Sequence, residues 1–289
     1  NGEGVIAYEI ERATGIQGIA WQKIATVPAH THAFTDTAPL LGETYWYRVR
    51  AVTIGDSSTY SNDSFNSTFD TVPSLNELYL MTLINEARAA PGAFGYPSYP
   101  PAPPLAYHPL VAYSARSHSQ SVLNSTFQFG HCDSIGRCPG ERTQAVGFTS
   151  GCGENLSTGN TDYQEMEMAN QGFLDSEGHR NNMLAPDYTV MGVGHTYDPT
   201  KGEAWRHGQM TEVFCGLDRE HPVLPLGAVV PYSGDGTTNF VYVITFYSKD
   251  GYSPTTAQVV IDGTPYAMTL STGTPAHGTY RYTTRLTTG

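Results

Sequence analysis

The chain has 289 residues, of which only 15% are charged, while Gly (30), Pro (19) and Tyr (19) are abundant. This length and composition favour two or three domains rich in β-structure over a helical bundle. Asp and Glu outnumber Lys and Arg by 27 to 15, a formal net charge of -12. No basic cluster could neutralise phosphate groups, so neither nucleic acid nor an anionic membrane is expected as a partner.

The location of the protein is indicated by its cysteines and by its lack of long apolar runs. No run approaches the ~20 residues that cross a bilayer, so no transmembrane span is expected. The chain opens with Asn1-Gly2-Glu3-Gly4 rather than a targeting segment, so any signal peptide lies outside this sequence. The four cysteines, all in the middle third, favour two disulfides in an oxidising compartment over a metal site. We therefore expect an extracellular or cell-surface protein. N-x-S/T glycosylation motifs, which fit export, occur at Asn62, Asn66, Asn124 and Asn155.

The first segment, residues 1–70, has the alternating pattern of half-buried strands. Strands are expected over Tyr8–Arg12, Trp21–Ala25 and Tyr45–Val52, with Gly, Pro and Asp at the turns. The Tyr-x-Ile-x-Arg strand, the Trp strand and the Tyr-x-Val-x-Ala run ending at Ala51 resemble a fibronectin type III module. The resemblance implies an all-β sandwich whose first strands are missing, of a kind that serves as a spacer or binding platform more often than as an enzyme.

The middle segment, residues 74–217, changes to helical periodicity and then back to strands, which predicts a mixed α+β domain. Ser74 and Glu77 form a capping box before a helix that turns Leu80, Leu83, Ile84 and Ala87 inward. Further helices are expected from Pro109 and from Thr161. Strands are expected over Val190–Tyr197 and Trp205–Cys215.

The last segment, residues 221–289, alternates again, and strands are expected over Phe240–Tyr247, Ala257–Ile261 and Thr279–Thr284. Its Lys-Asp-Gly, Ile-Asp-Gly and Gly-x-Tyr-x-Tyr runs resemble bacterial immunoglobulin-like modules, which implies a second all-β sandwich with its last strand missing. Its Gly turns hold three residues that could bind Ca²⁺, although ordinary hairpin chemistry is favoured because no D-x-D-x-D loop is present: Asp235, Asp250 and Asp262.

Short motifs in the middle segment follow one another in an order that is unlikely to arise by chance. They are Phe129–His131, Gly153–Leu156, Phe173–Leu184, Met191–Gly194, Trp205 and Glu212–Phe214. From Ser74 to Gly216 the chain resembles the CAP superfamily, which comprises cysteine-rich secretory proteins, antigen 5 proteins and pathogenesis-related proteins, in its bacterial form. The resemblance implies an α-β-α sandwich with a cleft lined by two histidines and two acidic residues.

The resemblance assigns cleft roles residue by residue. His131 and His179 match the two cleft histidines, and Glu154 matches the first acidic residue, with Asn155 beside it. The second acidic position departs from the pattern, because Ser176 occupies it and only the neighbouring Glu177 could compensate.

The resemblance also suggests a pairing for the cysteines. Cys132 and Cys138 are six residues apart, which suits a local disulfide beside the cleft. Cys152 and Cys215 fall on segments that neighbour each other in the central sheet of the resembled fold, and they are expected to pair.

Two imidazoles and a carboxylate can hold a divalent metal such as Zn²⁺ or transfer protons, and the same residues could equally be a structural hydrogen-bonded cluster. Catalysis is less expected than binding, because no activated nucleophile is visible and Cys132 is expected in a disulfide.

Two functions remain open at this stage. The first is an extracellular binding or scaffold protein that takes a glycan, lipid or protein ligand through its cleft and flanking modules. The alternative is a structural subunit of an extracellular filament or surface layer, in which copies assemble through their incomplete terminal β-modules. That alternative predicts subunit contacts at Asn1 to Ala7 and at Arg285 to Gly289, unless the sequence is a window from a longer chain.

Overall fold

The computed structural model describes residues 5–14, 21–38, 44–53, 55–58, 60–61, 64–67, 72–124, 129–133, 136–159, 163–201, 207–216 and 227–286. Asn62, Thr161, Trp205 and the outermost residues of both ends lie outside these ranges. The chain divides into two compact units, Asn1–Thr71 and Val72–Gly289. The division into three domains stays a prediction, because residues 72–289 group together.

The first unit is an antiparallel sheet, as its strand-like sequence predicts. Its strands are β1 (Val5–Thr14), β2 (Gln22–Pro28), β3 (Thr44–Thr53), β4 (Asp56–Ser57) and β5 (Ser64–Ser67). Their order is β2-β1-β3-β4, and β5 also pairs with β3. Ile10, Ala13 and Tyr45 are buried, as apolar positions of half-buried strands should be.

Charged and aromatic side chains of the first unit stack on one another. The Arg48 guanidinium lies 4.2 Å from the ring centroid of Trp21 and 3.9 Å from that of Tyr60. It also forms a 2.6 Å ion pair with Glu11. Cation–π contacts and the ion pair therefore hold neighbouring strands together on this unit's polar side.

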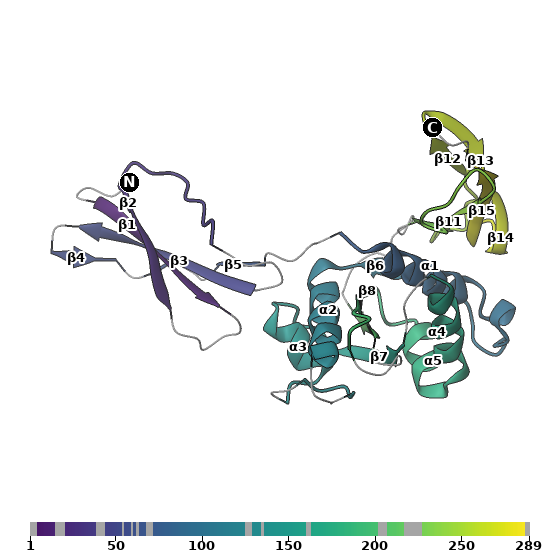
Figure 1. Cartoon of the computed structure of the whole chain (residues 1–289), viewed down its shortest axis with the longest axis horizontal. Coiled ribbons are helices and arrows are strands. Elements are labelled where there is room, and N and C mark those ends of the chain that lie inside the picture. Colours follow the sequence, from purple (N-terminus) through teal and green to yellow (C-terminus); the bar gives the residue numbers. More distant parts are fainter. Residues whose placement is uncertain are drawn as a thin grey trace. The chain divides into compact units, whose positions relative to one another are not determined.

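The second unit is built on a sheet with helices on both faces. The strands are β6 (Ala106–Tyr107), β7 (Cys152–Thr158), β8 (Val190–Tyr197) and β9 (Gly208–Cys215), in the order β6-β8-β9-β7. The helices are α1 (Leu75–Ala89), the 3₁₀ turn η1 (Pro91–Phe94), α2 (Pro109–Asn124), α3 (Pro139–Ala145), α4 (Tyr163–Asp175) and α5 (Glu177–Leu184). Figure 1 shows α2 and α3 on one side of this sheet and α4 and α5 on the other, a mixed α/β arrangement. None of the described helices is both long and apolar enough to cross a membrane.

Helix α1 begins as its sequence predicts. The Glu77 backbone N–H donates to the Ser74 hydroxyl at 3.3 Å, and the Ser74 N–H donates to the Glu77 carboxylate at 2.8 Å. This reciprocal capping box satisfies two amides that the helix itself leaves free. Leu80 and Ile84 are fully buried, which confirms the predicted inner face.

Strand β8 and helix α2 approach so closely that two glycines are required. A Cβ atom on Gly192 would lie 2.1 Å from the backbone nitrogen of Ala112, and one on Gly194 would lie 2.1 Å from that of Arg116. Any side chain at either position would push the helix off the sheet.

The C-terminal region adds a further antiparallel sheet to the second unit. Its strands are β10 (Gly227–Val230), β11 (Asn239–Tyr247), β14 (Thr269–Thr274) and β15 (His277–Arg285), in the order β10-β11-β15-β14. A separate hairpin consists of β12 (Gln258–Ile261) and β13 (Thr264–Ala267). Its turn has positive φ at Asp262 (48°) and Gly263 (79°), as a tight Asp-Gly hairpin requires.

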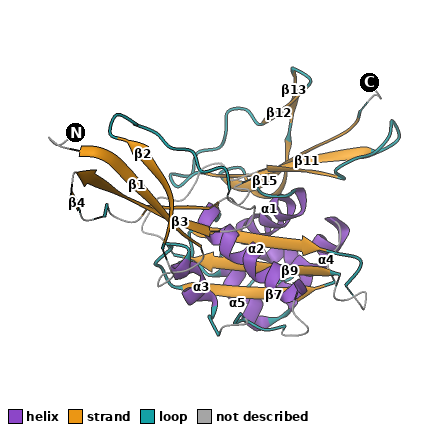
Figure 2. Cartoon of the chain, turned by 60° about the vertical axis from the view of Figure 1, so that its left-hand side comes forward, coloured by secondary structure: helices purple, strands orange, loops and turns teal. Residues whose placement is uncertain are grey.

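Helix α1 covers one face of this C-terminal sheet, in the place where a β-sandwich would have its second sheet. Val230 and Val243 belong to the same buried core as Leu80 and Ile84. Figure 2 shows β11 and β15 beside α1. Helix α1 is apolar on more than the face that meets the central sheet, so it can pack against the C-terminal sheet as well. The immunoglobulin-like sandwich expected for residues 221–289 stays a prediction. The hairpin contributes Tyr266, which stacks on Tyr282 of β15 at 5.1 Å.

Candidate binding site

The candidate site lies at β7, the edge strand of the central sheet. Successive side chains of a strand point to opposite faces. Glu154 is opposite Val213, which packs in the cluster formed with α2, whereas Asn155 is opposite Glu212 on the other face. Because β7 is an edge strand, residues that approach from both faces can meet around it.

Glu154 is the centre of the site and is almost completely buried. Its Oε1 lies 3.0 Å from Nδ1 of His131, and its Oε2 accepts a hydrogen bond from the Arg142 guanidinium. Both carboxylate oxygens are therefore engaged. The side chain of His131 is 56% exposed, so with Nδ1 directed at Glu154 its Nε2 is the nitrogen available to a ligand.

The loop that carries His131 is held from several directions. Arg142 also donates to the His131 carbonyl, so one guanidinium fixes both the loop and the carboxylate. His118 Nε2 lies 2.9 Å from the carbonyl of Gly130. The Cys132–Cys138 disulfide closes the loop. His131 is thus positioned by a rigid framework.

His179 reaches the site from helix α5. Its ring meets Phe173 edge to face at 5.1 Å, and its carbonyl accepts a hydrogen bond of 3.3 Å from the Asn155 amide. Burial lowers the pKa of His179, and the charge of His131 acts in the same direction. The His179 imidazole is therefore neutral at neutral pH, the form in which it can ligate a metal or accept a proton.

The electrostatics of Glu154 are dominated by its burial. Burial raises the pKa of Glu154 to about 7, against the opposing charges of Arg142 and His131.

A buried polar network supports the site from the second face of the sheet. The Asn155 amide donates to Glu212 Oε2 at 2.9 Å, and the Asn182 amide donates to Asn155 Oδ1 at 2.9 Å and to the Glu154 carbonyl at 3.1 Å. Glu212 is fully buried, and its Oε1 has no hydrogen-bond partner among the described residues. Burial raises the pKa of Glu212 to about 8, so this carboxyl group is neutral at pH 7.

Gly153, which precedes Glu154, leaves room for two polar side chains that pack against the strand. A Cβ atom there would lie 2.6 Å from the Tyr188 hydroxyl and 2.7 Å from Asn182 Oδ1. In the Gly-Glu-Asn motif, Gly153 therefore leaves space for neighbouring side chains, Glu154 contacts His131, and Asn155 donates a hydrogen bond to Glu212.

The structure contains the two disulfides expected from the resemblance. Cys132 and Cys138 have their Cα atoms 4.0 Å apart, and Cys152 and Cys215 have theirs 4.3 Å apart. Cys152 and Cys215 are directly opposite each other on β7 and β9.

Two other residues expected near the cleft contribute little to it. Ser176 stands at the N-cap position of α5, but its side chain makes no capping hydrogen bond there. Glu177 is exposed in the first turn of α5, and no ion pair joins it to His131 or His179 among the described contacts. Neither residue takes the place of a second cleft carboxylate.

Glycosylation at Asn155 is contradicted by the structure, because this side chain is fully buried and hydrogen-bonded. Asn124 is exposed at the end of α2, and its Oδ1 accepts a hydrogen bond from Lys201 at 3.2 Å. Asn62 and the side chain of Asn66 lie outside the described residues.

The Asp-Gly turns have structural explanations. Asp235 Oδ1 accepts hydrogen bonds from the Thr237 N–H at 2.9 Å and from its hydroxyl at 2.7 Å, an Asx turn. Asp262 occupies the left-handed position of the β12–β13 turn. Across the described ranges, no group of three His, Cys, Asp or Glu side chains is placed to hold a metal ion.

The expected three-ligand zinc site of His131, Glu154 and His179 is therefore corrected. Both Glu154 oxygens are already bonded, so Glu154 is not a free ligand. Glu154 is instead the hydrogen-bond partner that orients the His131 ring through Nδ1.

Sequence reasoning missed Arg142, Asn182, Glu212 and His118. The Cys138-x-x-Glu141 capping box, in which the Cys138 N–H donates to Glu141 at 2.8 Å, was a signal for the short helix that presents Arg142. An acidic residue inside the otherwise apolar strand Met210–Cys215 was the signal for Glu212.

Comparison with known proteins agrees with this architecture. Residues 81–215 match the family model described as CAP, the cysteine-rich secretory protein family. The uncharacterized protein YkwD of Bacillus subtilis (strain 168) is 30% identical over 114 residues, which cover 39% of this chain. The chain matches 40% of the length of that curated relative.

Two solved structures show weaker similarity. An extracellular protein containing a SCP domain from Bacillus anthracis str. Ames is 18% identical, with 65% of this chain and 68% of that chain covered and a TM-score of 0.38. An outer surface protein from Borrelia burgdorferi is 12% identical, with 47% of this chain and 92% of that chain covered and a TM-score of 0.37. The family match and the mixed α/β layers lead to one conclusion: residues 81–215 form a CAP-like domain, and the chain has additional β-sheet regions outside it.

Proposed function

We propose that the chain is an extracellular binding protein whose CAP-like domain takes its ligand at the cleft of His131 and His179. The two disulfides support an oxidising location, since such bonds rarely persist in reducing cytosol. The exposure of His131 beside an almost fully buried carboxylate supports a ligand site, because a purely structural cluster would bury the imidazole as well.

The observation that carries this proposal is the 3.0 Å contact between His131 Nδ1 and Glu154. It fixes the ring orientation and leaves Nε2 facing outward as a base or metal ligand. Bound Zn²⁺ would supply a Lewis acid at the cleft. The residues of the chain would supply two imidazoles, with Glu154 and Arg142 keeping His131 in place.

The test is a calorimetric titration of Zn²⁺ into the chain at neutral pH. We expect one strong site in the parent, and loss of that site in both His131→Ala and His179→Ala. His30→Ala removes an exposed histidine of the first unit and serves as the matched control. Binding should also weaken as the pH falls toward about 5, because protons compete with a metal ion for imidazole nitrogens. Equal zinc binding by His131→Ala and the parent would show that the cleft is not a metal site.

Glu154→Gln tests the orienting role separately. The amide keeps the shape of the carboxyl group but removes its charge, so zinc affinity should fall by roughly 10- to 100-fold rather than vanish. If Glu154 were a direct ligand instead, Glu154→Gln should lose as much zinc affinity as His131→Ala does.

The second candidate function is that of a structural subunit of an extracellular filament or surface layer. It is favoured by the β-sheet regions outside the CAP-like domain, which offer strand edges for assembly. Negative-stain microscopy and size-exclusion chromatography of native material separate the two functions. Discrete monomers support the binding protein, and ordered polymers support the subunit.

A further inference from the structure

Strand β10 forms an edge of the C-terminal sheet. Among the described strands it pairs only with β11, from Gly227 opposite Ile244 to Val230 opposite Val241. Every second N–H and C=O group of an antiparallel edge strand points away from its single neighbour. The outer side of β10 therefore presents main-chain donors and acceptors that can pair with an additional strand.

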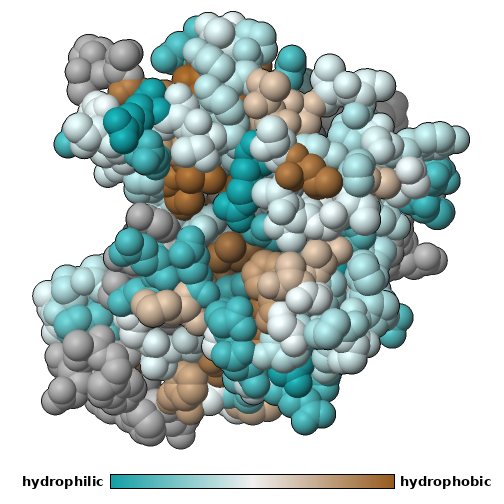
Figure 3. Space-filling view, turned by 90° about the vertical axis from the view of Figure 1, so that its right-hand side faces the viewer, coloured by the Kyte–Doolittle hydropathy of each residue, from teal (hydrophilic) through white to brown (hydrophobic). Residues whose placement is uncertain are grey.

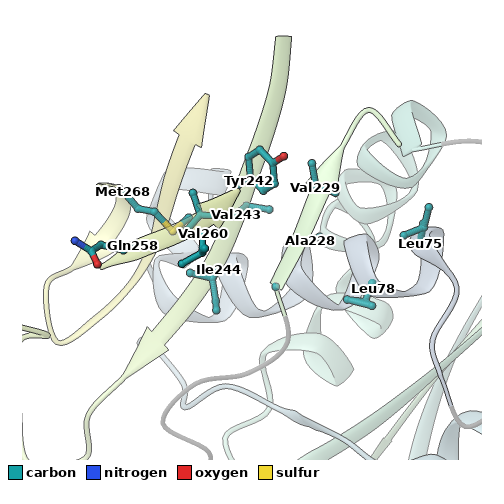
Figure 4. Close-up of a pocket in the computed structure, with 12 residues that line it drawn as sticks. Leu75, Leu78, Ala228, Val229, Tyr242, Val243, Ile244, Gln258, Val260 and Met268 are labelled. Carbon is teal, nitrogen blue, oxygen red and sulfur yellow. The ribbon is translucent and has the colours of Figure 1, made fainter. Parts of the chain in front are cut away.

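A pocket of about 460 Å³ runs along this edge. Figure 4 shows Leu75 and Leu78 of α1 to one side of β10, and Met268 and Val260 near the β12–β13 hairpin to the other. Ala228, on β10 itself, is small enough to leave the space between them open. The pocket is large enough to receive several aliphatic side chains.

The lining comes from both faces of the C-terminal sheet. Val243 lies in the core with α1, whereas its neighbour Tyr242 points to the opposite face. A pocket lined by both must pass around the edge of the sheet at β10. A peptide strand that lies along that edge could thus form main-chain hydrogen bonds with β10. Its side chains would point alternately toward α1 and toward the hairpin.

The lining contains no charged side chain, and its polar groups are limited to the Tyr242 hydroxyl and the Gln258 amide. The opposite edge strand, β14, consists of Thr, Ser and Gly except for Leu270. Charges and polar residues are the usual protection of an exposed edge. Figure 3 shows apolar side chains, coloured brown, gathered in a few patches and hollows of a surface that is otherwise mostly white and teal.

We propose that the outer edge of β10 is a docking site for an extended, uncharged polypeptide segment, which adds to the sheet as a strand beside β10. Because the incoming strand would be enclosed by α1 on one face and the hairpin on the other, it should be apolar on both faces. Strands buried on both sides have that composition. The segment needs about four residues in contact, matching the four residues of β10.

The test uses a synthetic peptide with acetylated and amidated ends, in which two valines flank an isoleucine between outer serine and threonine residues. A fluorophore on its end reports binding by anisotropy. We expect saturable binding to the full chain, together with slower hydrogen exchange of the β10 amides. A second peptide, with the same sequence but N-methylated on every backbone amide between its end caps, has no free N–H on either edge and should not bind.

Two exposed residues of the pocket provide variants that should fold normally. Leu75 is 51% exposed and Val260 is 64% exposed, and Leu75→Glu and Val260→Glu each place a charge against the incoming strand. Each should weaken peptide binding by roughly tenfold or more. Met168→Glu changes an apolar side chain that is 66% exposed on α4 and should leave binding unchanged.

Either of two results would overturn the proposal. Absence of binding at about 1 mM peptide would show that the edge does not accept a strand. Equal binding of the N-methylated and unmethylated peptides would show that the pocket takes apolar groups without strand pairing, as a small-molecule site would.

Discussion

The guanidinium of Arg281 on β15 lies 2.6 Å from the carboxylate of Glu86 on α1, and the hydroxyl of Thr272 on β14 donates to the same carboxylate at 2.6 Å. Glu86 is buried, so the C-terminal sheet supplies the hydrogen bonds that this charge needs. The sheet is therefore attached to the CAP-like domain by specific polar contacts as well as by an apolar core.

Arg281→Ala should destabilise the second unit by about 1–3 kcal/mol, because it leaves Glu86 buried without its cation while Arg281 itself is partly exposed. Urea unfolding measures the change. Arg285→Ala, on the same strand, removes only an exposed hydrogen bond to Asn239 and should cost less than about 0.5 kcal/mol. Equal effects of the two substitutions would rule out a stabilising role for the Glu86 contact.

Gly192→Ala and Gly194→Ala should each cost about 3 kcal/mol or more, because the new methyl group would overlap the α2 backbone. The control is Gly172→Ala on α4, where no atom lies within 4 Å of the new Cβ. That substitution should stabilise the fold by about 0.5–1 kcal/mol, since alanine favours helix. Thermal unfolding of the three variants should therefore give shifts of opposite sign.

Glu212→Gln should make stability less sensitive to alkaline pH. The pKa of Glu212 is raised from 4.5 to about 8 by burial, so the folded chain keeps this proton after the unfolded chain has lost it. Stability is then unaffected by this group below about pH 4.5 and falls as pH rises toward 8. The glutamine variant has no such group to titrate. The gain in its free energy of unfolding over the parent should therefore be absent at acidic pH and grow from about pH 4.5 to 8. A constant difference at every pH in urea titrations would contradict the assignment.

Removal of the two disulfides should have different effects on the free energy of unfolding and on zinc binding. Loop-closure entropy predicts a loss of about 4 kcal/mol for the pair Cys152→Ala and Cys215→Ala, which are 63 residues apart. The same relation predicts about 2 kcal/mol for Cys132→Ala with Cys138→Ala, separated by 6 residues. The second pair closes the loop of His131, so it should weaken zinc binding more than the first does. Calorimetry and urea unfolding of both double variants give this comparison.

Local features of the fold could be predicted because their causes are local. The Ser74 capping box and the Asp262-Gly263 turn each depend on residues within one turn of the chain. The order of the cleft motifs indicated that His131 would lie near Glu154, and the structure places them in contact.

Long-range features could not be predicted in the same way. Glu86 and Arg281 are 195 residues apart, and nothing in either segment marks its partner. A signal did exist in α1, where Tyr79 and Met81 are buried in addition to Leu80 and Ile84, so the helix is apolar around most of its circumference. Such a helix needs a partner on more than one side, and the C-terminal sheet is that second partner. Similarly, the contact of Arg142 with Glu154 depends on how the loop of His131 folds, which composition and periodicity do not specify.

The Cys152–Cys215 disulfide joins two residues that are directly opposite on β7 and β9, two positions before Glu154 on β7. A slip of one residue between these strands would carry Glu154 to the other face of the sheet and bring Asn155 in its place. In oxidising surroundings a covalent bond prevents that slip. In reducing surroundings the same register depends on the ladder of backbone hydrogen bonds and on buried side-chain contacts such as that of Asn155 with Glu212.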